Sequence, residues 1–188
     1  MAPLANAIAA STSSSMSGSA TSKTVFATVG TTQFETLVTT LLSDEVLQLL
    51  AGQGYKRLLL QLGRGPEPVV PVSPPLAIEW YRFKPSLDED MRDAELIISH
   101  AGAGSILEGM RLHALMVVVV NDALMHNHQQ ELAHELHSRA HLVSTTPSGL
   151  ANALQELGAA PPTLTPLKEP DPTIFPQYLL RALGLPSP

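Results

Sequence analysis

The 188-residue chain contains no cysteine. This absence excludes disulfide bonds, thiol catalysis and thiolate metal sites, and it fits a reducing compartment without proving one. Aromatic residues make up only 4% of the chain, which leaves little material for the stacking platforms that bind single-stranded nucleic acids. The formal net charge is −6, the opposite sign to that of a general nucleic-acid binder. A basic surface that tracks phosphates is therefore disfavoured.

Long apolar runs are also missing. The longest, Leu115 to Val120, is far short of the ~20 residues that a helix needs to cross a bilayer. The first 22 residues, MAPLANAIAASTSSSMSGSATS, carry no charged side chain. A secretory signal would need a basic start and a continuous apolar stretch, and a transit peptide would be rich in arginine. We therefore expect residues 1–22 to be a disordered tail.

The chain does have enough apolar material for one domain, since 44% of its residues are hydrophobic. Short apolar runs alternate with segments of helical periodicity. We expect strands at 25–29, 58–62, 76–83, 96–99, 116–120 and 141–144. We expect helices at 33–51, 87–92, 106–112, 127–138, 147–157 and 175–183. This alternation predicts an α/β fold with a doubly wound, parallel, Rossmann-like sheet.

Composition divides the chain into four parts: a Ser/Thr-rich tail over 1–22, a folded domain over 23–160, a Pro-rich linker over 161–173 and a terminal helix within 174–188. Thr32 and Glu35 have the spacing of a capping box, so we expect a single helix to begin there and to run to about Ala51. Gly52 and Gly54 would end it.

Two glycine-rich loops follow predicted strands. In parallel sheets ligands sit beyond the carboxyl ends of the strands, where residues 30–32 and 100–105 would both lie. Gly102 and Gly104 would let the backbone approach a ligand, and Ser105 would add a hydroxyl. Because the second loop opens into a helix, its N–H groups and the helix dipole suit an anion such as a phosphate. The alternative is an ordinary strand-to-helix turn that binds nothing.

The common nucleotide and hydrolase motifs are absent. No Gly-Lys pair exists to form a P-loop, and the first strand is followed by GTTQFE instead of G-x-G-x-x-G. The second strand ends at Gln61, where a dinucleotide-binding fold has an acidic residue. No G-x-S-x-G elbow is present either. A dehydrogenase or a serine hydrolase is therefore disfavoured.

Glu108 lies one helical turn beyond the second loop. Its carboxylate could accept hydrogen bonds from a ribose, although Ser105 and Glu108 also have the spacing of a local capping box. The next helix begins with amides and imidazoles, which suit sugar hydroxyls because an amide both donates and accepts: Asn127, His128, Gln129 and Gln130. The alternative is a polar helix start that faces water.

Seven histidines raise the question of a metal site. His134 and His137 are three residues apart, and His137 and His141 are four apart. No cysteine or carboxylate completes a convincing set, and the second pair straddles a predicted helix end. We therefore expect no bound metal.

Several segments, in order, resemble one family. The strand–SHAGAGS–helix block, VVVVND and MHNHQQELAHEL resemble the sugar-nucleotide-binding half of GT-B glycosyltransferases, of the glycosyltransferase family 28 C-terminal type. VFATVGTTQFETLV and GYKRLLLQLGRG are similar to the small soluble subunits of the two-part N-acetylglucosaminyltransferase of asparagine-linked glycosylation. The resemblance covers Lys23 to Leu157, and the terminal helix more loosely. Several ordered motifs together are specific, whereas any one alone is weak.

The resemblance implies a reaction. N-acetylglucosamine would pass, with inversion, from UDP-N-acetylglucosamine to N-acetylglucosaminyl-pyrophosphoryl-dolichol, giving lipid-linked chitobiose, the second step of dolichol-linked oligosaccharide synthesis. Only the donor half would be present, so a membrane-anchored partner would bind the lipid acceptor and form a heterodimer with this chain. The chain would then lie in the cytoplasm and on the cytosolic face of the endoplasmic reticulum. No cofactor is expected, and the general base would belong to the partner.

The resemblance also implies a binding role for each residue of this chain that matches a family motif. The loop that binds the pyrophosphate would comprise Ser99, His100, Gly102, Ala103, Gly104 and Ser105. The ribose ligand would be Glu108, and the residues that bind the hydroxyls of the donor sugar would be Asn127, His128, Gln129 and Gln130. The loop beside the diphosphate and the cleft between the two halves would be Gly30, Thr31 and Thr32. Loop N–H groups and the helix dipole would stabilise the charge of the leaving group.

The chain departs from the family pattern after the helix that carries Glu108. The family usually has a glycine and a proline there, where this chain reads LHALM over 112–116. Losing a C-cap glycine costs about 1 kcal/mol, so we expect the helix to run further or to end differently.

The terminal helix, IFPQYLLRALGL, has two interpretations. It could pack back on its own sheet, or it could dock on the partner through a face formed by Phe175, Tyr178, Leu179 and Leu183. We favour docking, because in one-chain relatives the terminal helix crosses to the other half. Two alternatives for the whole chain stay open: a non-catalytic nucleotide-sugar-binding or scaffold protein, and a fragment of a one-chain family member.

Overall fold

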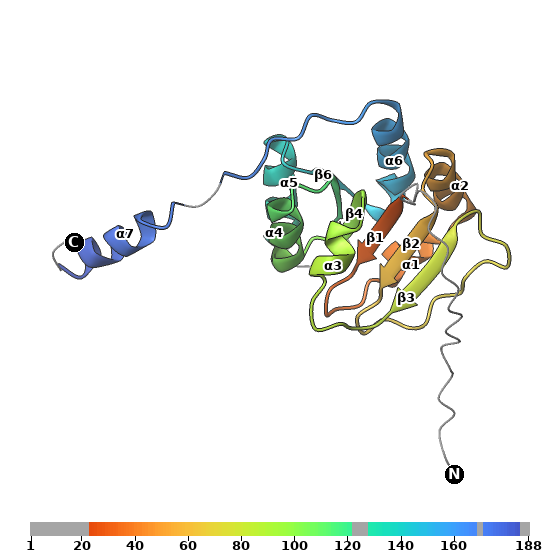
Figure 1. Ribbon diagram of the computed structural model, residues 1–188, viewed down its shortest axis with the longest axis horizontal. Helices are drawn as coiled ribbons and strands as arrows, with labels where there is room; N and C mark the ends of the chain where they lie inside the picture. The colour runs from red at the N-terminus through yellow and green to blue at the C-terminus, as the bar shows by residue number, and fades with distance from the viewer. Residues whose placement is uncertain (1–22, 122–127, 169–170, 185–188) are drawn as a thin grey trace, which may run out of the picture.

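A computed structural model describes residues 23–121, 128–168 and 171–184 (Figure 1). At its centre is a six-stranded parallel sheet in the order β3-β2-β1-β4-β5-β6. The strands are β1 (Thr24–Thr28), β2 (Arg57–Gln61), β3 (Ala77–Tyr81), β4 (Leu96–His100), β5 (Met116–Val119) and β6 (Val143–Thr145). This strand order is that of the doubly wound Rossmann fold, so the predicted α/β class is confirmed.

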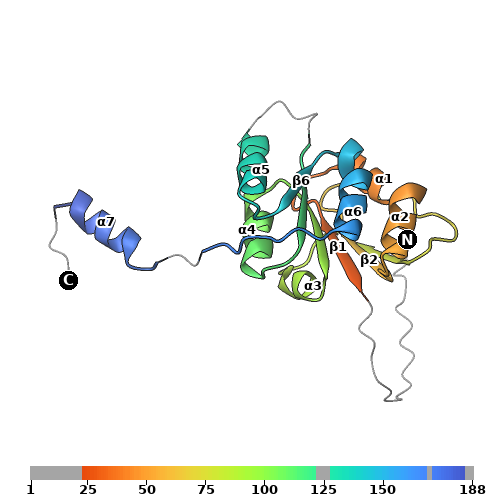
Figure 2. The ribbon, with the colours of Figure 1, turned by 90° about the horizontal axis from the view of Figure 1, so that it is seen from above.

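Helices cover both faces of the sheet (Figures 1 and 2). One face carries α1 (Glu35–Leu41), α2 (Asp44–Gly52) and α6 (Leu150–Ala159), which follows a short 3₁₀ turn, η1 (Pro147–Gly149). The other face carries α3 (Asp88–Arg92), α4 (Ala103–Arg111) and α5 (His128–Ser138). Successive side chains of a strand point to opposite faces, so Val25 and Ala27 enter the first core layer and Phe26 the second.

The middle of the sheet is the most buried part of the molecule. Every residue of β1 and of β5 is buried, as expected of strands covered on both faces, whereas the edge strand β3 is mostly exposed. The carboxyl ends of β1 and β4 are paired neighbours at Thr28 and Ser99. The chain leaves these two strands toward opposite sides of the sheet, which makes their ends the topological switch point of the fold.

The single helix expected over 33–51 is two helices, so that prediction is wrong. Ser43 interrupts it, because its side chain accepts the N–H of Val46 at 3.4 Å and caps α2. The capping box is also wrong: Phe34 occupies the N-cap of α1 without a side-chain bond, and the Thr32 hydroxyl donates to the Val29 carbonyl at 2.9 Å. The break lets α1 and α2 each bury its own apolar face.

The helix α4 ends without a glycine. His113 has φ 54°, the left-handed conformation that glycine usually takes after a helix. Its N–H donates to Met110 at 3.1 Å, and the N–H of Ala114 donates to Gly109 at 3.3 Å. These two bonds form a Schellman motif, so the helix stops at Arg111 and a non-glycine residue takes the strained position.

The proline-rich segment after α6 is attached to the body near its middle. The N–H of Thr165 donates to the carbonyl of Ala140 at 2.7 Å, and the Nδ1 of His141 lies 2.7 Å from the carbonyl of Thr165. Leu167 packs against the core layer beneath α4 and α5. Residues 168–173 then lead to the last helix.

That helix, α7 (Ile174–Ala182), lies away from the body in both views (Figures 1 and 2). None of its residues is buried, and Phe175 and Tyr178 are 70% and 68% exposed. The interpretation that it packs back on its own sheet is therefore wrong, while docking on a partner stays a prediction. Within the described ranges, no helix is both long and apolar enough to cross a membrane.

Candidate functional site

A cleft of about 400 Å³ opens at the topological switch point. Its lining includes seven of the residues predicted to bind the donor: Gly30, Thr31, His100, Gly102, Gly104, Ser105 and Glu108. The structure thus brings together two loops that lie some 70 residues apart in the sequence, because β1 and β4 are neighbours.

Two glycines make room for one imidazole ring in this cleft. A Cβ atom on Gly30 would lie 2.5 Å from the Cε1 of His100, and one on Gly102 would lie 2.3 Å from its Nε2. Gly30 also has φ +64°, which disfavours any other residue. Gly104 differs, since nothing lies within 4 Å of the position of its Cβ. Packing does not require a glycine at 104, so the open space there is available to a ligand.

The ring of His100 is held as a neutral group. Burial lowers its pKa below the ordinary value, and the backbone of Thr28 opposes this shift less strongly. Its buried Nδ1 has no hydrogen-bond partner among the residues that the structure describes. At neutral pH the imidazole therefore gives the cleft a polar wall without a positive charge.

The positive end of α4 supplies the attraction for an anion. The helix begins at Ala103, three residues earlier than predicted, so Gly104 and Ser105 lie in its first turn. Gly102 is the N-cap, and no side chain caps it. The N–H groups of a first turn have no acceptor within the helix and add to the macrodipole. They suit a phosphate that enters from the cleft.

Glu108 is exposed and lines the cleft one turn further along α4. The capping-box alternative for this residue is wrong, because Ser105 is the third residue of the helix and not its N-cap. The carboxylate is therefore available to a ligand as a hydrogen-bond acceptor.

Other predicted residues lie behind or beside the cleft. Ser99 is fully buried, and its hydroxyl donates to the carbonyl of His100 at 2.9 Å, so it supports the loop from behind. The hydroxyl of Thr32 is bonded to Val29. Neither residue lines the cleft, nor does Ala103.

The segment predicted to bind the sugar is only partly described. Asn127 lies outside the described residues, and His128 begins α5. Gln129 is exposed and Gln130 is half-buried in the first turn of α5. Neither is part of the cleft lining, so the described geometry does not test these four predictions.

Sequence reasoning missed one buried side chain, Gln61. Its Nε2 donates to the carbonyls of Gly30 at 2.8 Å and of Arg82 at 2.6 Å, and its Oε1 accepts from Thr28 at 2.5 Å. Gln61 is 3% exposed and lines the cleft floor. The sequence shows that β2 does not end in an acidic residue, but the role of the amide depends on three backbone segments that only the fold brings together.

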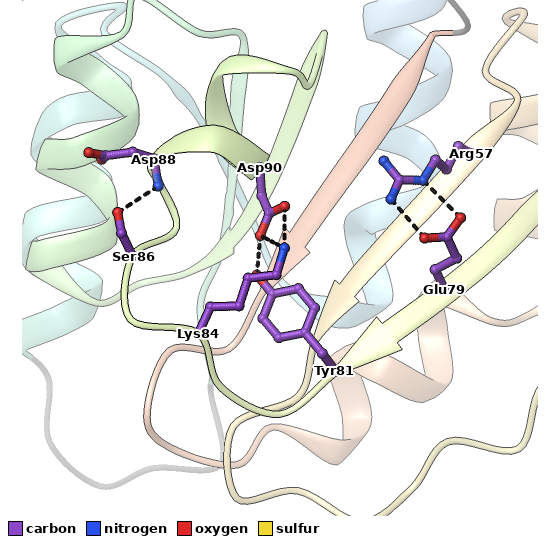
Figure 3. A network of polar contacts seen from close by, with 7 residues as sticks. All are labelled: Arg57, Glu79, Tyr81, Lys84, Ser86, Asp88 and Asp90. Carbon is purple, nitrogen blue, oxygen red and sulfur yellow. Dashed lines mark hydrogen bonds and ion pairs between the residues drawn. The ribbon is translucent and has the colours of Figure 1, made fainter. Parts of the chain in front are cut away.

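The wall formed by residues 83–87 was also missed. Lys84 donates to Asp90 at 2.7 and 2.8 Å, and its ammonium lies 4.5 Å from the ring centroid of Tyr81 (Figure 3). The Tyr81 hydroxyl donates to the same carboxylate, so burial and Asp90 both raise the pKa of Tyr81. This network ties the wall to α3. Phe83, 55% exposed, presents an aromatic ring beside the cleft.

Two histidines of the suggested metal set have other partners. The Nδ1 of His137 accepts the N–H of Ser144 at 3.1 Å, and His141 is bonded to Thr165. Over the described residues, no three His, Asp or Glu side chains gather in a group that could hold a metal ion.

Known proteins resemble this chain in sequence. It is 48% identical over 127 residues to the human protein named UDP-N-acetylglucosamine transferase subunit ALG13, a match that covers 66% of this chain and 11% of that protein. It is 31% identical over 159 residues to the Saccharomyces cerevisiae protein of the same name, covering 67% of this chain and 79% of that one. The chain thus spans about a tenth of the length of the human and mouse relatives, 11% and 12%.

Solved structures resemble this chain in fold. An NMR structure of ALG13 superposes with a TM-score of 0.62 at 27% identity, covering 85% of this chain and 94% of that one. Acinetobacter baumannii MurG superposes with a TM-score of 0.56 at 18% identity, covering 76% of this chain and 42% of that one, which shows a shared fold only. Residues 24–171 match the profile of the glycosyltransferase family 28 C-terminal domain. Together with the parallel sheet and the cleft at its switch point, these matches place the chain in the glycosyltransferase family 28 C-terminal domain family.

Proposed function

We propose that this chain is the donor-binding subunit of an N-acetylglucosaminyltransferase. It would transfer N-acetylglucosamine from UDP-N-acetylglucosamine to N-acetylglucosaminyl-pyrophosphoryl-dolichol, forming lipid-linked chitobiose for protein N-glycosylation. The observation that carries this proposal is the uncapped N-terminus of α4, which opens into a glycine-lined cleft at the switch point of the sheet. The names of the human and yeast relatives support the choice of donor and sugar.

The cleft supplies a place for each part of the donor. The diphosphate would lie over Gly104 against the first-turn N–H groups of α4, and Ser105 would add a hydroxyl donor. Glu108 would accept the ribose hydroxyls, and Phe83 offers its ring to the base. The sugar would then point toward the start of α5, where Gln129 and Gln130 lie.

Transfer would proceed by a single displacement with inversion. An acceptor hydroxyl oxygen attacks the anomeric carbon, the bond from that carbon to the UDP oxygen breaks, and the hydroxyl proton passes to a base. The charge that develops on UDP would be stabilised by the helix N–H groups and dipole, without a metal. Glu108 is the one carboxylate in the described lining and is assigned to the ribose, so the base would come from the acceptor-binding partner.

The partner would be a membrane-anchored subunit that binds the lipid acceptor on the cytosolic face of the endoplasmic reticulum. α7 supports this proposal with an exposed apolar face formed by Phe175, Tyr178, Leu179 and Leu183. The relatives are named as subunits, which supports a two-part enzyme. A subunit that needs a partner could also have no catalytic role, so a second candidate is a non-catalytic nucleotide-sugar-binding or scaffold subunit.

The test is transfer of labelled N-acetylglucosamine to the pyrophosphoryl-lipid acceptor by the chain alone and by the chain with membranes that carry the partner but lack the native soluble subunit. We expect activity only in the combined sample. Glu108→Ala should abolish transfer and leave partner binding intact, and Glu45→Ala, an exposed carboxylate on α2, is the matched control. Partner binding without transfer by the unaltered chain would leave the scaffold candidate.

A further inference from the structure

A second hollow, of about 430 Å³, lies outside the cleft and has no part in the proposed reaction. Its walls are α1 and the segment that follows β2, and most of its lining is apolar: Phe34, Val38, Leu42, Leu62, Pro66 and Val69. We call this hollow the α1 groove.

The outer wall of the α1 groove stands in water. Val69, the last residue of the lining, is 91% exposed. Pro66 and Pro68 stiffen this wall, and its start is held by the N–H of Arg64, which donates to the carbonyl of Thr32 at 2.9 Å. A stiff apolar wall beside an apolar hollow is a surface of the kind that binds another protein segment.

The charges of the α1 groove limit what can fill it. Glu35 lies on the helix wall and Glu67 on the outer wall, and no basic side chain belongs to the described lining. A suitable occupant is therefore an apolar segment that carries a cation and no carboxylate.

The helix α7 has this chemistry. Phe175, Tyr178 and Leu179 lie at positions i, i+3 and i+4, so they share one exposed face. Arg181 is near its end, and the helix, IFPQYLLRA, has no acidic residue. α7 cannot reach the groove of its own chain easily, because the chain is attached at Leu167 and α4 and α5 lie between α7 and the α1 side (Figures 1 and 2). Residues 168–173 span no more than about 25 Å.

We propose that α7 of one copy binds in the α1 groove of a second copy of this chain. Because helix and groove are different surfaces on different sides of the molecule, the contact is head-to-tail. One short helix buries less than the ~1,000 Å² of a stable interface, so the association is weak and depends on concentration. If the proposed function holds, the partner subunit uses the same helix face, and partner binding and self-association exclude each other.

Sedimentation velocity of the full chain over a range of concentrations tests the contact. We expect the sedimentation coefficient to rise with concentration. Val38→Glu in the groove and Leu179→Glu in the helix should each abolish that rise, and Leu107→Glu, an exposed leucine on α4, should not. Mixing the two deficient variants should restore a dimer, because one keeps the helix and the other keeps the groove.

A charge exchange tests the contact even if Val38→Glu fails to fold. Arg181→Glu should weaken the association at least tenfold, and Glu35→Lys with Glu67→Lys should restore it. A monomer at every concentration, or variants that fail to complement each other on mixing, would overturn the proposal. Cross-linking of the groove to the membrane partner without self-association would overturn it too. Sedimentation does not depend on transfer activity. A failure of this contact therefore does not affect the proposed function, and a failure of the proposed function does not affect this contact.

Discussion

Gln61 holds Gly30 in place across the centre of the sheet, with its side-chain amide 2.8 Å from the Gly30 carbonyl. The same amide group holds Arg82, and its oxygen holds Thr28. A single buried side chain thus ties together the ends of β1, β2 and β3, from which the walls of the cleft begin. The shape of the cleft depends on a residue that need not touch the ligand.

Replacing this amide tests that dependence. Gln61→Met keeps the size of the side chain but removes its hydrogen bonds to two carbonyls and one hydroxyl in a buried place, so we expect the free energy of unfolding to fall by about 2–3 kcal/mol. UDP affinity should fall as well, because Gly30 is no longer held. Urea unfolding and calorimetric UDP titration measure the two effects. Gln48→Met, on the exposed side of α2, should change neither; equal losses in both variants would contradict the prediction.

A substitution at Gly104 should affect ligand binding without lowering the stability of the fold. Gly104→Ala meets no protein atom and lies within a helix, so we expect stability to stay constant or to rise by up to ~1 kcal/mol. The added methyl group points into open space at the N-terminus of α4, where it should lower UDP affinity at least tenfold. Thermal unfolding and UDP titration distinguish the two effects.

The matched variants for this test are two other glycines. Gly52→Ala in α2 also meets no atom, so its stability should likewise stay constant or rise slightly, and its UDP affinity should not change. Gly102→Ala should lower both, because its methyl group would collide with the imidazole of His100. Unchanged UDP affinity in Gly104→Ala would show that the phosphate does not lie there.

The strained end of α4 predicts a stabilising substitution. His113→Gly relieves the left-handed conformation, and we expect a gain of about 0.5–1 kcal/mol in the free energy of unfolding. Leu112→Gly, one residue earlier at an ordinary helical φ, should instead lose stability. Chemical denaturation measures both. A loss in His113→Gly would mean that the imidazole makes a contact worth more than the strain.

Burial of His100 predicts a dependence of stability on pH. The folded protein lowers the pKa of this imidazole, so the unfolded chain binds a proton more readily than the folded one. The buried neutral imidazole contributes fully to the free energy of unfolding above the ordinary pKa of about 6.5, and this contribution is lost as the pH falls below that value. Urea midpoints at pH 7.5 and 5.0 should differ less in His100→Gln than in the unaltered chain. His134→Gln, an exposed histidine of α5, should keep the full difference.

Local patterns predicted most of the fold because it depends on local physics. Short apolar runs that alternate with helical segments predict the strands, and the glycines after β4 predict the loop without any knowledge of the neighbouring strands. The errors arose where two local signals competed. Thr32 and Glu35 had capping-box spacing, but the Thr32 hydroxyl bonded to Val29, and Ser43 capped a second helix.

The sequence by itself determined the fold class and the family, and it located the glycine-rich loop after β4, because periodicity and ordered motifs are properties of neighbouring residues. Only the tertiary structure decided which of those residues face the cleft: it turned Ser99 inward, placed Glu108 in the lining and brought Gln61 beneath Gly30. Among the described residues, it also left α7 and the α1 groove without partners. These outcomes depend on which strands pair, and pairing joins residues that no local pattern relates.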